Sequence, residues 1–303
     1  MTRDTLRGQK KVGGLVTALL TPFDQNGGVD GRALARLVRF QIDKGVDGLY
    51  PCGTTGLGPM LNVDERKQVA ETVVKEASGK VPVIVQVGSA DTASTVALAK
   101  HAERIGADAV ASLTPYYYKP GENATVKHFE AISRSIGIPL FAYNIPQFTG
   151  NNLRPSVVSS MAKTGTISGI KDSSRDFLQL QEIIESVPEG FTVMNGTEEY
   201  ALFALMIGAA GLVSGGANAF PEAMKALVVA QREGDYQAAL AAHWVLLKIK
   251  DATSAGPIPA YYEVLRKRGI DCGSPRPPIL PLDVSAAKKV MRDLSPMRLW
   301  QDR

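Results

Sequence analysis

Two patterns of hydrophobic positions alternate along the chain. Short, nearly continuous apolar runs are typical of strands buried on both faces, and longer stretches with an apolar residue every three or four positions are typical of amphipathic helices. Runs of the first kind occur at residues 15–20, 48–51, 83–87, 109–113, 140–143, 169–171, 192–194 and 212–214. Helical patterns separate them, for example at 31–44, 63–78, 91–105 and 123–135. This alternation predicts an α/β protein with a parallel sheet, and eight such units predict a (β/α)8 TIM barrel.

Local start and stop signals support several of these helices. Asp64 is the expected start of the second helix, and Asp91 with Thr92 the expected start of the third, because these side chains cap helix N-termini. The glycines in "DKGVDG" and "RIGADA" are expected to end two helices in a left-handed conformation just before the next strand.

The last part of the chain carries helical patterns and no further strand pattern. They lie at 223–233, 236–253, 258–267 and 284–293, with the proline-rich connector "GSPRPPILPLD" before the last. We therefore expect an N-terminal extension over residues 1–12, a barrel core over 13–220, and additional C-terminal helices packed on the barrel over 221–303.

Composition narrows the class of protein. Hydrophobic residues make up 45% and charged residues 21% of the 303 residues, which is a globular balance with enough apolar sequence for a large core. The formal net charge is +4, but acidic residues are interspersed with the basic ones. We expect no nucleic-acid partner, whereas an anionic small molecule is compatible. Cys52 and Cys272 have no paired spacing, so a reducing cytoplasm fits best.

The N-terminal region superficially resembles a signal peptide, because basic residues precede the apolar run at 12–20. Gly13 and Gly14 interrupt that run and "TPF" leads it into a turn, which favours a first barrel strand. No apolar stretch is long enough to span a membrane, so no membrane partner is expected.

Polar side chains follow several of the predicted strands. In TIM barrels the catalytic groups lie at the carboxyl ends of strands. The candidates at such ends are Tyr116, Tyr117, Tyr143, Lys171, Glu198 and Glu199.

Lys171 follows an apolar run and is expected to point into the barrel mouth. A neutral lysine amine there can add to a ketone and give a protonated imine, which accepts electrons when a carbon–carbon bond breaks or forms. The alternative is a solvent-exposed lysine paired with Asp172. Position alone supports the two equally.

The neighbouring motifs have their own alternatives. Tyr143, which ends the fifth strand, is either a proton relay or a buried ring with a satisfied hydroxyl. "CGTTGLGP" at 52–59 is either a carboxylate-binding turn or only a tight turn, and Cys52 within it is expected to be a small buried hydrophobe. The tyrosines of "TPYYYKP" suggest a lid or a subunit contact, of which the contact is favoured.

The histidines do not point to a metal. His101, His128 and His243 lie inside helical patterns without ligand spacing, so no metal is expected. The pair Glu198-Glu199 opens a helix, where acidic side chains are favoured without any function.

Four motifs occur together in order: "GTTG" at 53–56, "PYY" at 115–117, "YNIP" at 143–146 and "GIKDS" at 169–173. With them the chain resembles the dihydrodipicolinate synthase/N-acetylneuraminate lyase (DapA-like) family, from "TPF" at 21–23 to "RPPILPL" at 276–282. The resemblance implies that Lys171 is the Schiff-base lysine, that Tyr143 relays protons, and that Thr54 and Thr55 beside Gly53 hold a pyruvyl carboxylate.

The same resemblance implies an assembly and a pocket wall. Tyr117 matches a relay tyrosine that reaches into a neighbouring subunit's site, and a homotetramer built as a dimer of dimers is implied. No cofactor is implied. Candidates for the pocket wall are Phe148, Ser173, Gly196, Glu198, Val213 and Ser214.

The substrate is where members of the family differ. Dihydrodipicolinate synthases typically carry an arginine two residues after the proline of the YNxP motif. This chain has Phe148 at that position, and an apolar ring cannot bind a carboxylate in the bidentate manner of a guanidinium. "GTTGLGP", "ASLTPYYYKP" and "SPRPPILPLD" resemble archaeal-type 2-keto-3-deoxygluconate aldolases, although these tend to read "YNYP" and to have arginine near Lys119.

We therefore expect a class I aldolase that cleaves a 2-keto-3-deoxy sugar acid to pyruvate and an aldehyde. Three alternatives remain. They are 4-hydroxy-tetrahydrodipicolinate (dihydrodipicolinate) synthase, an N-acetylneuraminate-lyase-like aldolase in which Glu198 and Glu199 bind sugar hydroxyls, and a non-catalytic binder of a 2-oxo acid.

Overall fold

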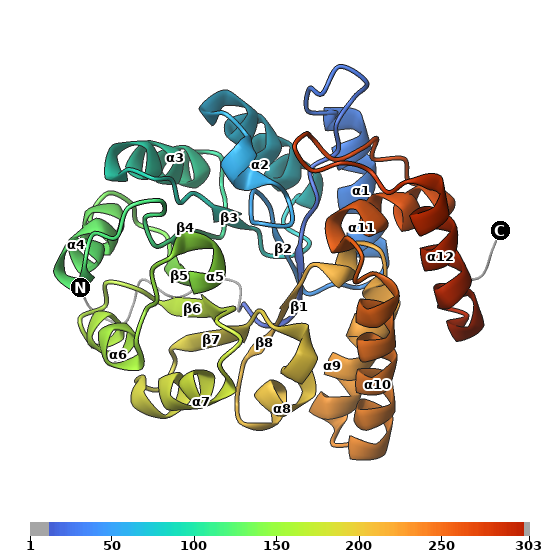
Figure 1. Cartoon of the computed structure of the whole chain (residues 1–303). Coiled ribbons are helices and arrows are strands. Elements are labelled where there is room, and N and C mark those ends of the chain that lie inside the picture. The colour runs from blue at the N-terminus through green and yellow to red at the C-terminus, as the bar shows by residue number, and fades with distance from the viewer. Residues whose placement is uncertain (1–11, 300–303) are drawn as a thin grey trace.

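The computed structural model describes residues 12–299, which form a barrel of parallel strands inside a ring of helices (Figure 1). The strands are β1 Gly14–Ala18, β2 Gly48–Tyr50, β3 Ile84–Gln86, β4 Ala109–Leu113, β5 Leu140–Asn144, β6 Gly169–Asp172, β7 Thr192–Asn195 and β8 Gly211–Ser214. They pair in the order β2-β1-β8-β7-β6-β5-β4-β3. A parallel bridge between Leu49 and Val83 closes the circle. The predicted TIM barrel is confirmed.

The outer ring consists of the helices that follow the strands. They are α1 Gly31–Asp43, α2 Val63–Ala77, α3 Thr92–Arg104, α4 Glu122–Ser133, α6 Pro155–Lys163, α7 Phe177–Ser186, α8 Ala201–Met206 and α9 Pro221–Glu233, with the single turn α5 Pro146–Thr149 after β5. Short 3-10 turns, η2 Gly58–Met60, η3 Glu198–Tyr200 and η4 Gly216–Asn218, lie in the loops after β2, β7 and β8. Every strand and helix range expected from the sequence matches an observed element to within two residues at each end.

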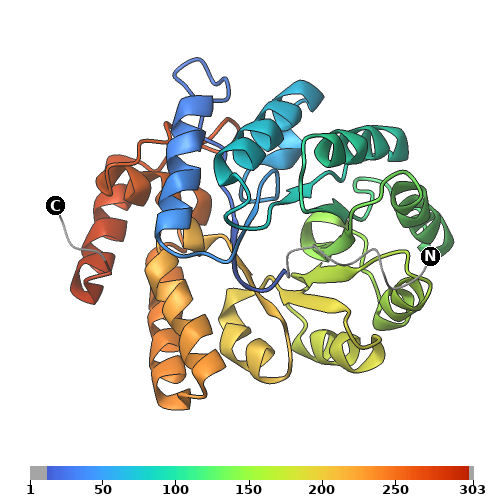
Figure 2. The same ribbon diagram turned by 180° about the vertical axis from the view of Figure 1, so that it is seen from behind.

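Three further helices follow the ring: α10 Tyr236–Ala252, α11 Pro257–Lys267 and α12 Val284–Leu294, with the 3-10 turn η5 Ser295–Met297 after them. Viewed from both sides, they stand on the flank of the barrel next to α1 and α9 (Figures 1 and 2). Helix α9 packs on β8 and β1. The division at residue 220 stays a prediction, and the expected N-terminal extension, apart from Val12, lies outside the described residues. Within residues 12–299 no helix has the length and apolarity needed to cross a membrane.

Two apolar layers hold the barrel together. One fills its interior with inward side chains such as Val16, Ile84 and Met194, and the other packs the outward face of the strands against the helices. Because successive side chains of a strand point to opposite faces, Ile170 lies in the outer layer and Lys171 points into the barrel.

Helix boundaries follow the expected signals with one exception. Asp91 caps α3 by accepting from the backbone N–H of Ser94, and Gly45 and Gly106 adopt the left-handed conformation at helix ends. The expected start at Asp64 is wrong. Asn62 caps α2 instead, because its side chain and that of Glu65 bind each other's backbone N–H groups reciprocally.

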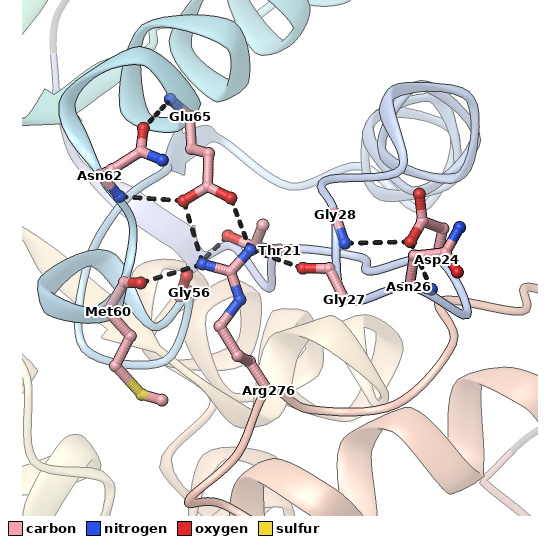
Figure 3. Close-up of polar contacts among 10 residues, drawn as sticks. All are labelled: Thr21, Asp24, Asn26, Gly27, Gly28, Gly56, Met60, Asn62, Glu65 and Arg276. Carbon is pink, nitrogen blue, oxygen red and sulfur yellow. Dashed lines mark hydrogen bonds and ion pairs between the residues drawn. The ribbon is translucent and has the colours of Figure 1, made fainter.

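The connector before α12 is fastened to the loops after β1 and β2 (Figure 3). The Arg276 guanidinium donates to both carboxylate oxygens of Glu65, at 2.6 and 2.9 Å, and to the carbonyl oxygens of Gly27 and Met60. Its hydrogen bonds lower the pKa of Glu65. The C-terminal segment thereby braces the loops at the carboxyl ends of the first two strands.

Candidate active site

Lys171 lies inside the barrel mouth between two aromatic rings. Its side chain is almost completely buried, with 4% of the residue exposed. Its Nζ lies 4.0 Å from the ring centroid of Tyr143 and 4.7 Å from that of Tyr50. The two rings meet edge to face with their centroids 5.8 Å apart. Lys171 therefore points into the barrel mouth as predicted.

The alternative of an exposed Lys171–Asp172 ion pair is wrong. Asp172 is fully buried on the other face of β6 and accepts hydrogen bonds from the side chains of Asn144, Ser174 and Gln179. Burial raises the pKa of its carboxyl above the ordinary value. Among residues 12–299 no carboxylate is within ion-pair distance of Lys171 Nζ, so the lysine amine is available to a ligand.

Asn144 and Asp172 connect the strands of the candidate site, a role that the sequence analysis assigned to neither residue. Asn144 donates to Asp172 Oδ2 at 2.8 Å and accepts from the backbone N–H of Leu153 at 3.0 Å. The bond to Asp172 joins the ends of β5 and β6, which carry Tyr143 and Lys171, and the bond from Leu153 ties β5 to the segment before α6. The signal was present, since both residues lie inside the motifs "YNIP" and "GIKDS".

The Tyr143 hydroxyl is 3.2 Å from Thr54 Oγ1, which links the end of β5 to the turn after β2. That turn is closed by hydrogen bonds from Leu57 to Thr54 and from Gly58 to Gly53. Gly58 packs directly against the Cys52 carbonyl, so a side chain could not replace its hydrogen without moving the turn. Thr54 and Thr55 are partly exposed and free to contact a ligand.

Cys52 beneath this turn is fully buried, and burial raises the pKa of its thiol to about 11. Cys52 is a small buried hydrophobic residue, as expected.

Gly196, the residue after β7, lies close to the side chain of Lys171. A Cβ built on Gly196 would lie 2.9 Å from Lys171 Cε and would overlap Ser173 Oγ. Val213 lines the barrel interior, and Ser173 is buried beside Lys171. The predicted wall residues Gly196 and Ser173 therefore lie close to the lysine stem.

Glu198 is buried and bound within the protein. Its Oε1 accepts from Ser214 Oγ at 2.5 Å and from the backbone N–H of Gly216 at 3.0 Å. Lys250, on α10, lies 3.8 Å from Glu198 and 3.2 Å from Glu199. The acid pair is thus partly neutralised by a lysine of the C-terminal helices, which the sequence analysis did not connect with the site.

Two predicted site residues stand at the rim. Tyr117 is 86% exposed and its ring contacts that of Tyr118, and Phe148 on α5 is 70% exposed. Within residues 12–299 neither has a hydrogen bond or ring contact with Lys171 or Tyr143. Their roles toward a substrate stay predictions.

The three histidines lie in α3, α4 and α10 and are buried. His128 is bound to Thr92 Oγ1 at 2.9 Å, and burial lowers its pKa to about 4. His101 binds Glu71 at 2.8 Å. These residues are part of the helix packing, as expected.

The arrangement combines a buried amine, a tyrosine–threonine hydroxyl pair within hydrogen-bond distance of each other, and a glycine-rich turn with donors at the barrel mouth. An amine in such surroundings can form an imine with a carbonyl compound while a hydroxyl moves the protons. No residue pattern for binding a phosphate as a P-loop does is present in that turn.

Known proteins share this sequence and fold. The sequence model described as the dihydrodipicolinate synthetase family matches residues 11–297. A 4-hydroxy-tetrahydrodipicolinate synthase from Chlorobium phaeobacteroides is 36% identical over 274 residues, covering 89% of this chain and 92% of that protein. An uncharacterized DapA-like lyase from Halobacterium salinarum is 36% identical over 287 residues, covering 94% of each.

Among solved structures, YagE from E. coli K12 in complex with pyruvate superposes with a TM-score of 0.91 at 29% identity. The superposition covers 95% of this chain and 99% of that one. YagE is described as a prophage protein belonging to the dihydrodipicolinic acid synthase family.

Proposed function

This chain belongs to the dihydrodipicolinate synthetase family, and we propose that Lys171 is the nucleophile with which it binds pyruvate. The chain is a pyruvate-dependent carbon–carbon lyase of class I. The single observation that carries the role of Lys171 is its burial in the barrel mouth, 4.0 Å from the ring of Tyr143 and without a carboxylate partner in the described part of the chain.

In the proposed reaction the groups at the barrel mouth act in sequence. Lys171 Nζ adds to C2 of pyruvate, and the carbonyl oxygen leaves as water when the imine forms. Loss of a proton from the methyl group gives an enamine, whose carbon attacks an aldehyde, and the reverse sequence cleaves the product. The Tyr143 hydroxyl transfers the proton to the departing oxygen, and Thr54, at 3.2 Å, is its partner in that transfer. Thr54 and Thr55 hold the carboxylate together with the turn's N–H groups.

We weigh two candidate reactions. The similarity to 4-hydroxy-tetrahydrodipicolinate synthases favours the reaction of those relatives, in which pyruvate condenses with aspartate semialdehyde, over the sugar-acid cleavage that the sequence analysis placed first. Phe148 favours a 2-keto-3-deoxy sugar acid, because it stands where the synthases have the arginine for the aldehyde's carboxylate. We propose the synthase reaction as the first candidate and the sugar-acid cleavage as the second.

The test compares both reactions in one preparation. Condensation is followed with a coupled reductase, and cleavage is followed as pyruvate released from a panel of keto-deoxy sugar acids and sialic acid. The first candidate predicts a higher kcat/KM for aspartate semialdehyde than for any sugar acid. The reverse order, together with a gain in condensation in Phe148→Arg, would establish the second.

We also propose a homotetramer. Exposed apolar side chains lie on α8 and α10, and we call this group the α8–α10 patch; its members on α10 are one turn apart. They are Phe203, Met206, Tyr236, Leu240 and Trp244. The Phe203 ring contacts His243, so the two helices lie side by side. A surface of this kind is typical of a subunit contact.

The exposed tyrosines Tyr117 and Tyr118 offer a second contact near the barrel mouth. Sedimentation should show a tetramer for the wild type and a smaller species for Trp244→Glu. The control Leu280→Glu, on an exposed leucine outside the α8–α10 patch, should remain tetrameric. A wild-type monomer would contradict the proposal.

We further propose a cytoplasmic location, which the free and buried thiols of Cys52 and Cys272 support.

A further inference from the structure

Tyr50 is a buried aromatic residue at the end of β2 that lies across the barrel from the lysine. Its ring centroid is 4.7 Å from Lys171 Nζ, and the ring of Tyr143 approaches the same nitrogen at 4.0 Å. The ring centroids are 5.8 Å apart, farther from each other than either is from the nitrogen, so the two rings approach the nitrogen from different directions. Tyr50 is 2% exposed, and the Cβ of any side chain at Gly53 would press on its ring edge. The ring is therefore held in place by its surroundings.

The hydroxyl of Tyr50 does not explain its position. Within residues 12–299 its Oη is buried without a hydrogen-bond partner. Burial raises the pKa of the phenol well above its ordinary value, so the ring stays neutral at physiological pH. Leaving a buried hydroxyl unpaired is unfavourable. The feature of Tyr50 that reaches the reacting nitrogen is the ring face.

A ring face attracts a cation through its quadrupole, and the attraction grows when the cation is desolvated. When Lys171 condenses with a 2-oxo acid, the nitrogen forms a double bond to carbon and two of the ammonium protons leave with the carbonyl oxygen as water. One positive charge stays on the nitrogen. The iminium has only one N–H left, so water stabilises it less than it stabilises the ammonium. The ring faces then supply a larger share of its stabilisation.

We propose that Tyr50 is a further catalytic residue, which with Tyr143 forms a two-sided aromatic cage around the positively charged imine nitrogen of Lys171. The inference rests on the proposed function, because it needs the imine. It assigns the effect to the ring of Tyr50 and none to its hydroxyl. It therefore predicts that phenylalanine replaces Tyr50 and that an aliphatic residue does not.

The experiment measures the exchange of pyruvate methyl protons in deuterated water by NMR, a partial reaction that needs no aldehyde. Tyr50→Phe should stay within about threefold of the wild type in kcat/KM for exchange. Tyr50→Leu should lose about tenfold, the size expected when one of two ring faces is removed from a desolvated cation. Phe141→Leu also replaces an aromatic side chain inside the barrel with an aliphatic one, so it is the matched control for the loss of packing.

Fluorination separates the ring's electrostatics from its shape. Mono-, di- and trifluorophenylalanine at position 50 progressively weaken the negative ring face with little change in size. The cage predicts that kcat/KM falls stepwise along this series while the melting temperature stays constant. Equal rates along the series, or a Tyr50→Phe variant as slow as Tyr50→Leu, would overturn the proposal. A wild type that exchanges no methyl protons would instead contradict the proposed function.

Discussion

Gly196→Ala tests how closely the barrel mouth is fitted around Lys171. The added methyl carbon would lie 2.9 Å from Lys171 Cε and 3.1 Å from the Asp172 carbonyl oxygen, and it would overlap Ser173 Oγ. Nonbonded carbon atoms prefer about 3.5–4.0 Å, so Cε must retreat by roughly 0.6–1.1 Å. A misplacement of about 1 Å at a reacting group can lower a rate on the order of 100-fold, equivalent to about 2.7 kcal/mol of activation free energy.

The assay is pyruvate methyl exchange at saturating and subsaturating pyruvate, with a thermal melt of the same sample. We expect kcat/KM to fall on the order of 100-fold, and overpacking to lower the free energy of unfolding by about 1–3 kcal/mol. Gly31→Ala is the control, because its Cβ would meet nothing closer than 3.9 Å at the start of α1. If Gly196→Ala folds and exchanges methyl protons at the wild-type rate, the close packing of Lys171 against β7 does not matter to the reaction.

Three further changes probe other parts of the account. Tyr143→Phe keeps the ring beside Lys171 but removes the hydroxyl bonded to Thr54. Exchange of the pyruvate methyl protons should therefore slow by about 10²–10⁴-fold. A decrease in this rate of less than tenfold would exclude Tyr143 as the proton relay. His128 has a folded-state pKa of about 4 against an ordinary 6.5, so its neutral form contributes stability that is complete above pH 6.5 and is lost as the pH falls toward 4. When the pH is lowered from 7 to 4, the free energy of unfolding should therefore fall by about 3 kcal/mol more in the wild type than in His128→Gln. Chemical unfolding measures this difference, and parallel pH profiles of the two proteins would contradict it. The fully buried Asn218 accepts from the N–H of Leu20 and donates to the carbonyls of Ala18 and Gly215. Asn218→Ala should therefore lower the free energy of unfolding by about 3 kcal/mol. A decrease below about 1 kcal/mol would mean that water replaces these bonds.

The barrel was predictable because its strands are buried on both faces and therefore appear as continuous apolar runs. The same regularity places Lys171 on the inward face once the strand is known. Helix starts are less certain, since several residues near a boundary can cap. Asp64 and Asn62 are two such residues, and only Asn62 exchanges hydrogen bonds with Glu65.

The partners of Lys171 could not be deduced from its own strand. Tyr50 comes from β2 and reads in the sequence as one more apolar residue of the run "GLYP". It meets Lys171 only because the barrel closes. Lys250 lies in a C-terminal helix far from Glu198 in the chain, and their approach depends on how α10 packs on the barrel. Contacts of this kind are set by tertiary packing rather than by a local pattern.

The central claim is that Lys171 forms an imine with pyruvate, and its most direct measurement is reductive trapping. The protein is incubated with pyruvate, reduced with borohydride, digested and analysed by mass spectrometry. The account predicts one reduced pyruvyl group per chain, on the peptide containing Lys171, and none in Lys171→Ala. A wild type that remains unmodified, or a pyruvyl group on any other lysine, would contradict it.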